Sequence, residues 1–203
     1  MRPAPNLIEL TARGNDSILP DEMKWWHRLI FALSGAVLNF LLASITHYFD
    51  IPLYLDSLFT LLITINLGVV AGLMTAVCTN GMLAIAGQVL FPFVLCHILT
   101  VLIAYYFTVR HRLNSHVGYL IMGLCIALGN GLLGSFISFL LFEGVTLVHT
   151  IDNLVFSILT TGRALASAVF WAGMLTNFMD KIISAIFAIV LQNPFEKLIR
   201  RGL

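Results

Sequence analysis

Long apolar runs dominate this sequence, and they restrict its fold more than any other feature. A helix needs about 20 mostly apolar residues to cross the hydrocarbon core of a bilayer, and the chain supplies a series of such runs separated by short polar interruptions. Of its 203 residues, 59% are hydrophobic and only 10% are charged, which is far from the usual composition of a soluble domain. The sequence therefore predicts an all-α integral membrane protein.

The polar interruptions predict six transmembrane helices and one short segment outside the membrane. The first helix is expected to end at "HYFDIP" and the last one at "QNP". The expected spans cover residues 28–48, 53–66, 69–87, 90–109, 117–142 and 164–191, and the outer segment covers 153–161. This divides the chain into a cytoplasmic N-terminal segment (1–27), a six-helix membrane domain (28–192) and a basic cytoplasmic tail (193–203).

Charged residues test the number of spans independently, because Lys and Arg accumulate on the cytoplasmic side of membrane proteins. With the N-terminus inside, Asp50, Glu143 and Asp152 fall in outer loops, and Arg163 lies at the outer end of the last span. Six spans place the following basic residues on the cytoplasmic side: Lys24, Arg28, Arg110, Arg112, Lys197, Arg200 and Arg201. Both the N- and C-termini are therefore expected in the cytoplasm.

The sequence lacks several motifs that would indicate other functions. It has no GxxxxGK[ST] phosphate loop, no HExxH zinc motif and no GxSxG nucleophile motif, so no enzyme activity is expected. Cys78, Cys96 and Cys125 lie in apolar runs without CxxC spacing, which argues against a metal site or disulfides. The net charge of +1 gives no indication of nucleic-acid binding.

Polar side chains within the spans are costly in lipid unless they face protein, water or a ligand. At a rise of about 1.5 Å per residue, most of them fall in the outer half of the bundle, which suits a pocket open to the outside. The asparagines and His97 have a second interpretation as interhelical hydrogen-bonding residues. The charged residues Asp56 and Arg163 have one as ion pairs with Asp152, with Glu143 or with each other. The candidate substrate-binding residues are Asp56, Asn80, His97, Asn130, Arg163 and Asn177, with Tyr54 and Trp171 available for stacking.

An acid and a base, Asp180 and Lys181, stand side by side within the last apolar run. Consecutive helical residues point about 100° apart, so the two side chains are not expected to face each other. By its place in the run, the pair is expected in the inner half of the helix, away from the pocket. Lys181 would reach towards the cytoplasmic interface, and Asp180 would turn inward to a polar partner. We predict a structural or coupling role for both rather than substrate contact.

Several short motifs, in the same order, resemble the substrate-binding (S) subunits of energy-coupling factor (ECF) transporters. The stretch "IPLYLDSLFTLLITINLGVVAGLMTAVCTN" is similar to the second and third helices of these subunits. It is followed by "GVT" at 144–146, by Asp152, and by "NFMDKIISAIFAIVL", which resembles their sixth helix. The resemblance extends over about residues 28–200. Asn177 departs from the pattern, because many such subunits have an acid at this position.

This resemblance implies a protein of the prokaryotic cell membrane that captures a vitamin-like micronutrient from outside. Delivery would require a separate membrane coupling subunit and two ATPase subunits, which would use the ATP, and no cofactor is expected in this chain. The resemblance also implies that Ala32 and Ala36, spaced four residues apart, form the docking face for the coupling subunit. Two other classes stay open, a membrane ligand-sensing module and a stand-alone facilitator, and the sequence does not indicate the substrate.

Overall fold

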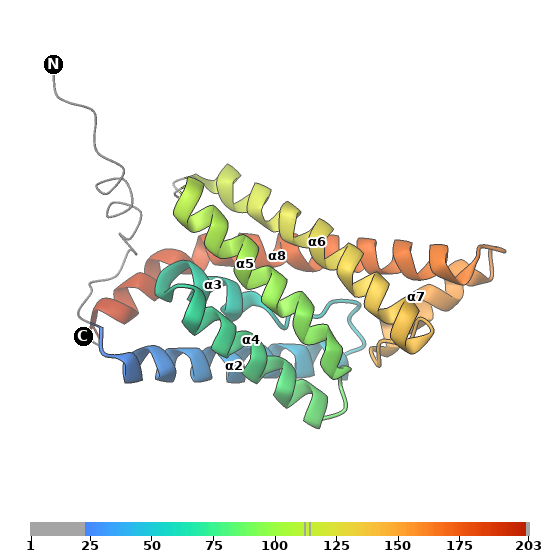
Figure 1. Cartoon of the computed structure of the whole chain (residues 1–203), viewed down its shortest axis with the longest axis horizontal. Helices are drawn as coiled ribbons and strands as arrows, with labels where there is room; N and C mark the ends of the chain where they lie inside the picture. The colour runs from blue at the N-terminus through green and yellow to red at the C-terminus, as the bar shows by residue number, and fades with distance from the viewer. Residues whose placement is uncertain (1–22, 112, 114, 202–203) are drawn as a thin grey trace, which may run out of the picture.

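The computed structural model describes residues 23–111, 113 and 115–201 as a bundle of helices along a common axis, with one short helix across one end (Figure 1). No strand occurs among these residues. The elements are α2 (Trp25–Tyr48), α3 (Leu58–Leu67), α4 (Val69–Ile85), the 3-10 turn η1 (Phe91–Phe93), α5 (Val94–His111), α6 (His116–Phe142), α7 (His149–Leu159) and α8 (Leu165–Arg201). The predicted all-α fold is confirmed.

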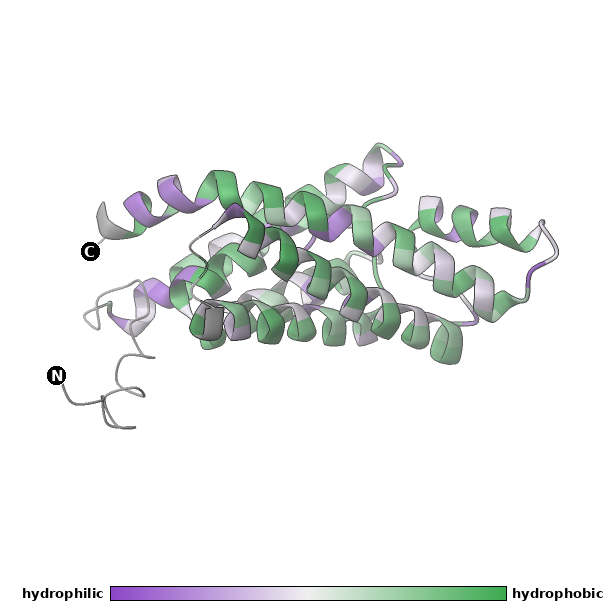
Figure 2. Cartoon of the chain, turned by 90° about the horizontal axis from the view of Figure 1, so that it is seen from above, coloured by the Kyte–Doolittle hydropathy of each residue, from purple (hydrophilic) through white to green (hydrophobic). Residues whose placement is uncertain are grey.

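Four helices are long and apolar enough to cross a membrane: Trp25–Tyr48, Phe91–Val109, His116–Phe142 and Leu165–Ile199. The helices α3 and α4 are apolar but shorter, with 10 and 17 residues. Many large apolar side chains are exposed on the bundle, and the hydropathy colouring shows that most residues of its helices are hydrophobic (Figure 2). A surface of this kind is stable against lipid chains rather than against water, so the protein is an all-helical membrane protein.

The second predicted helix starts later than the sequence indicates. We expected it to begin at residue 53, but residues 51–57 are not helical, and the helix begins at Leu58. We call residues 51–57 the extended segment, although the backbone bends at Pro52 and Leu55 has φ +46°. Extended backbone at membrane depth is stable only where protein or a water-filled cavity surrounds it, because lipid cannot hydrogen-bond the peptide groups. Side chains of other helices supply these bonds: Asp180 accepts the N–H of Leu55 at 2.7 Å, and Asn39 accepts that of Phe59 at 2.8 Å.

A single glycine turns the chain sharply between α3 and α4. Gly68 has φ +86°, in the left-handed region that favours glycine. The two helices then pack closely, since a Cβ added to Gly72 would overlap the side chain of Thr64. The expected break after Asn66-Leu67-Gly68 is confirmed, and α3 and α4 form a tight helical pair.

The last helix continues beyond the predicted stop. We expected it to end at "QNP", but α8 runs through Pro194 to Arg201, so most of the predicted tail belongs to the bundle. A proline within a helix removes one backbone hydrogen bond. Ile199 lies beyond it, is fully buried and packs in a cluster with Met23 and Leu67. The burial of this apolar side chain offsets the lost bond.

The expected docking face of Ala32 and Ala36 is not on the surface. Both alanines are buried, with 0% and 1% of their surface exposed, and Thr75 Oγ1 on α4 donates a hydrogen bond to the carbonyl oxygen of Ala32 at 3.2 Å. The side of α2 that carries them packs inside the bundle, because small residues let helix backbones approach closely. The docking interpretation of these two residues is therefore wrong.

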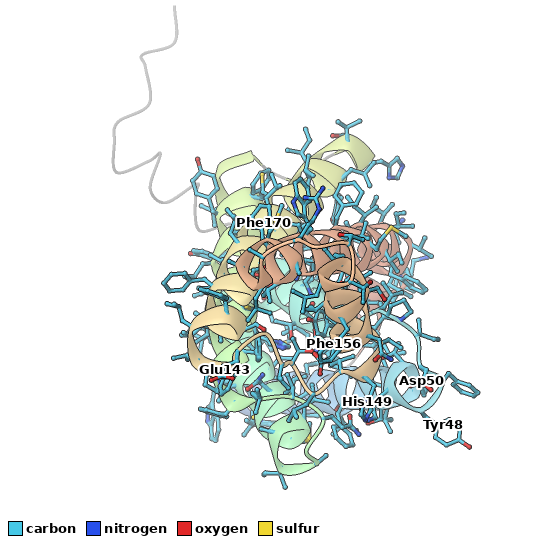
Figure 3. The ribbon with its side chains drawn as sticks, turned by 90° about the vertical axis from the view of Figure 1, so that its right-hand side faces the viewer. Tyr48, Asp50, Glu143, His149, Phe156 and Phe170 are labelled. Atoms are coloured by element: carbon cyan, nitrogen blue, oxygen red, sulfur yellow. The ribbon has the colours of Figure 1, made fainter. Side chains whose placement is uncertain are left out.

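The two ends of the bundle differ in charge. Lys24 precedes α2, and Lys197 lies near the end of α8, at the end of the bundle where both helices carry hydrophilic residues (Figure 2). The opposite end carries α7, and Asp50 and Glu143 lie at its edge (Figure 3). The extended segment 51–57 starts from this second end and leads into the bundle, which positions the site described next.

Candidate functional site

A cavity lies between the extended segment, α5, α6, α7 and α8. The empty space between its lining atoms is about 640 Å³, including the part that is open to solvent. Of this space, about 40 Å³ is reached by the centre of a water-sized sphere, which is room for a few water molecules. The lining residues are Tyr54, Asp56, Ser57, Val89, Phe93, Cys96, His97, Thr100, Asn130, Gly134, Ser135, Ser138, Thr146, Ile151, Val155, Val169, Gly173, Asn177 and Lys181.

Five of the eight predicted substrate-binding residues line this cavity: Tyr54, Asp56, His97, Asn130 and Asn177. They come from four separate parts of the chain, the extended segment and helices α5, α6 and α8. Of the five, Asn177 already uses its amide Nδ2 within α8, where it donates to the carbonyl oxygen of Gly173 at 2.9 Å. The structure thus brings together residues that the sequence places up to 123 positions apart, from Tyr54 to Asn177.

The other three predicted residues lie away from the cavity. Asn80 is fully buried in α4, and neither polar atom of its amide has a partner among the described residues. Arg163 is exposed just before α8, and Trp171 is exposed on α8; both line a shallow groove beside Ser157 of α7. The predicted stacking role of Trp171 in the pocket and the predicted pocket position of Arg163 are therefore corrected.

Charged residues form a buried cluster at one wall of the cavity. Asp56 Oδ2 lies 3.2 Å from His97 Nε2, and Asp56 Oδ1 lies 3.7 Å from Lys181 Nζ. Lys181 also donates to Ser57 Oγ at 2.6 Å and forms an ion pair with Asp180. The partners of Asp56 are thus His97 and Lys181 rather than Arg163. Buried charges of opposite sign in contact compensate one another's loss of hydration.

This cluster changes the interpretation of the acid–base pair. Asp180 does turn inward to a polar partner, as predicted, because it accepts the backbone N–H of Leu55. Lys181, however, lines the cavity and is only 4% exposed, so the expectation that it reaches for the cytoplasmic interface is wrong. The two side chains also contact each other, although consecutive helical residues diverge. A long lysine stem bends back to its neighbour when water is absent.

The opposite wall consists of α5 and α6, which are joined by one polar contact. Asn130 Nδ2 donates to Thr100 Oγ1 at 2.8 Å, and Thr100 Oγ1 donates to the carbonyl oxygen of Cys96 at 3.0 Å. Three buried polar atoms of this wall have no hydrogen-bond partner in the described part of the chain: His97 Nδ1, Asn130 Oδ1 and Ser138 Oγ. Unpartnered buried polar atoms cost free energy and are rare in native structures.

The end of the cavity near α7 is mostly apolar. Ile151 and Val155 of α7 line it together with Val169 of α8. The loop before α7 is fixed by Asp152, whose Oδ1 accepts both the backbone N–H and the hydroxyl of Thr146 at 2.8 Å. The "GVT" motif and the following aspartate therefore shape the cover of the cavity.

Sequence reasoning missed several lining residues, among them Ser57, Thr100 and Ser138. One signal was present for the last of them, because Asn130, Gly134 and Ser138 recur every four residues, which places them on one face of a helix. No group of three or more His, Cys, Asp or Glu residues capable of holding a metal ion occurs within residues 23–111, 113 and 115–201.

Comparison of the chain with protein-family models, with curated proteins and with solved structures finds no match.

Proposed function

We propose that this chain is the substrate-capture subunit of an ECF-type importer, which binds a vitamin-like micronutrient outside the cell and delivers it with a separate coupling subunit and ATPases. One observation carries the proposal: the bundle contains a cavity, partly open to solvent, whose wall has three buried polar atoms without a partner among the described residues. A ligand that hydrogen-bonds these atoms would remove their energetic cost. The motif order that resembles ECF substrate-binding subunits supports the same assignment.

Six membrane crossings are part of this proposal. In it, residues 51–57 and the ten residues of α3 together make the second crossing of the hydrocarbon core. With α4 as another crossing, the start of α2 and the end of α8 lie on one side in this proposal, and the basic residues Lys24 and Lys197 support the cytoplasm as that side.

The packing beyond the cavity supports capture rather than free passage. Between the cavity and the basic end of the bundle, α3, α5, α6 and α8 share an apolar cluster. Its central members, Leu61, Met122 and Ile126, are each at most 2% exposed. A stand-alone facilitator needs a continuous polar path through both halves, and this cluster interrupts such a path. A subunit that depends on a partner for delivery does not need one in its own structure.

Affinity purification of the tagged full chain from its own membranes tests the energised part of the proposal. We expect a coupling subunit and two nucleotide-binding ATPase subunits to co-purify, and the complex to hydrolyse ATP. A matched preparation of an unrelated tagged six-helix membrane protein controls for non-specific capture. Purification without any ATPase, from cells that take up the bound ligand through this chain, would contradict the importer assignment and favour a facilitator.

A further inference from the structure

Each charged side chain at this wall of the cavity already contacts a partner of opposite charge. Lys181 has three ammonium protons, and three oxygens lie around its Nζ: one each from Asp180, from Ser57 at 2.6 Å and from Asp56 at 3.7 Å. The second oxygen of Asp56 faces His97 Nε2 at 3.2 Å. An anionic ligand would meet a lysine that already lies between two carboxylates, and a cationic ligand would have to compete with Lys181 for them. A charged ligand would therefore be buried without a counter-ion.

The amide of Asn130 offers one atom to a ligand, and its neighbours fix which atom this is. Thr100 has a single hydroxyl proton, and it donates this proton to the carbonyl oxygen of Cys96 at 3.0 Å. Thr100 Oγ1 can therefore only accept from Asn130, at 2.8 Å, so the atom that faces it is the donor Nδ2. The remaining amide atom, Oδ1, is an acceptor without a partner in the described structure.

Two further atoms are open to a ligand on the same wall. His97 Nε2 bonds Asp56, which leaves Nδ1 as the free atom of the ring, and Ser138 Oγ has a free hydroxyl. Both residues are nearly fully buried, with 4% and 2% exposed. Ser138 lies eight residues after Asn130 on α6, which corresponds to about 12 Å along the helix axis. The polar atoms thus mark two points of the cavity, whose lining also includes the apolar residues Phe93, Ile151 and Val169.

We propose that the cavity selects an uncharged small molecule whose N–H or O–H group donates a hydrogen bond to Asn130 Oδ1. The middle of the ligand is apolar, and a second polar group, about 12 Å away by helix rise, meets Ser138. Asn130 determines specificity, because a ligand without the donor leaves Oδ1 unpaired, which costs about tenfold or more in affinity. This inference rests on the proposed function in that the cavity must bind a small molecule.

A mixture of metabolites separated by charge tests the inference while the ligand is still unidentified. Water-soluble yeast extract is divided by ion exchange into neutral, anionic and cationic fractions at equal mass, and each is added to the detergent-solubilised full chain. The thermal unfolding temperature and the rate of Cys96 alkylation are measured in a variant in which Cys78 and Cys125 are serine. We expect the neutral fraction to raise the unfolding temperature and to slow alkylation, because Cys96 lines the cavity.

Two variants link the result to the proposed atoms. Asn130→Leu should lose the effect of the neutral fraction, with the apparent affinity lowered about tenfold or more. Ser138→Ala gives a smaller loss and serves as a second test if Asn130→Leu does not fold. Ser157→Ala is the matched control, because its hydroxyl is exposed on α7 and does not line the cavity; its response should equal that of the unmodified chain.

The possible outcomes separate this inference from the proposed function. Protection by the anionic or cationic fraction alone would overturn the inference of an uncharged ligand and leave the capture function standing. If the neutral fraction slowed Cys96 alkylation equally in the unmodified chain and in both variants, the proposed role of α6 would be overturned. Failure of every fraction to change the unfolding temperature or the alkylation rate would count against a ligand cavity altogether, and with it against the proposed function.

Discussion

On the α8 side of the cavity, Asp180, Lys181 and the extended segment satisfy one another's polar groups, whereas on the α5–α6 side three buried polar atoms have no partner within the described residues. Both walls contain polar residues in a membrane protein, where such residues are costly. The polar residues of the two walls therefore have different roles. The first wall holds a non-helical segment in place, and we infer that the second wall is complete only when a ligand is bound.

Removal of the central cation from the first wall should have the largest effect. Lys181→Met leaves Asp56 and Asp180 buried without their shared partner, and the loss of one member of a buried ionic cluster costs about 3–5 kcal/mol. We expect a strongly lowered unfolding temperature in detergent. Lys197→Met is the matched control, because Lys197 is exposed at the end of α8. Equal stability of the two variants would show that the cluster does not hold the structure together.

The close contact between α6 and α8 sets the distance between the two walls, and its disruption should have the next largest effect. A Cβ added to Gly123 would lie 2.7 Å from the Cβ of Ala185 and 3.1 Å from the backbone oxygen of Lys181. Since the second of these atoms belongs to the backbone, Gly123→Ala should destabilise the fold by about 1–3 kcal/mol.

The matched substitution for this test is Gly81→Ala, because a Cβ at Gly81 in α4 would have no atom within 4 Å. Alanine is a better helix former than glycine by about 1 kcal/mol, so we expect this variant to be at least as stable as the unmodified chain. Thermal unfolding of both variants gives the comparison. A Gly123→Ala variant as stable as Gly81→Ala would mean that α6 and α8 approach less closely than described.

The smallest effects on stability are expected for substitutions of two serines on the cavity side of α6. Ser135 Oγ donates to the carbonyl oxygen of Val169 at 3.3 Å, whereas Ser138 Oγ has no partner in the described chain. Without ligand, Ser135→Ala should lower stability by about 0.5–1.5 kcal/mol, and Ser138→Ala should be neutral or slightly stabilising. Chemical unfolding of both variants in the same detergent checks this order. A larger loss for Ser138→Ala would assign a structural role to its hydroxyl.

The sequence was sufficient to predict the helices whose hydropathy alone decides their position. The predicted span 117–142 differs by one residue from α6, His116–Phe142. The start of α3 and the end of α8 depend instead on distant contacts. The bond from Leu55 to Asp180 joins residues 125 positions apart, and Ile199 extends α8 beyond Pro194 because it is buried against other helices. The pattern of neighbouring residues in the sequence does not indicate contacts between distant parts of the chain.

The candidate site was predictable to a similar degree. A polar residue in an apolar run is visible in the sequence, and five of the eight predicted residues line the cavity. The predicted position of Lys181, away from the pocket, was wrong because we counted residues along α8 alone. The extended segment brings Asp56 to within 3.7 Å of Lys181. Ala32 and Ala36 were assigned to the surface because a small-residue face is equally suited to packing inside a bundle and against a partner.

The most direct test of the account is native mass spectrometry of the full chain, gently extracted from its own membrane, beside the Asn130→Leu variant. We predict that the 22.4 kDa chain carries a bound small molecule, uncharged when released, and that an Asn130→Leu variant with an unchanged unfolding temperature carries none. If the bare chain mass dominates both spectra, or if both proteins carry the same adduct to the same extent, the α5–α6 wall is not the ligand-binding surface that we describe.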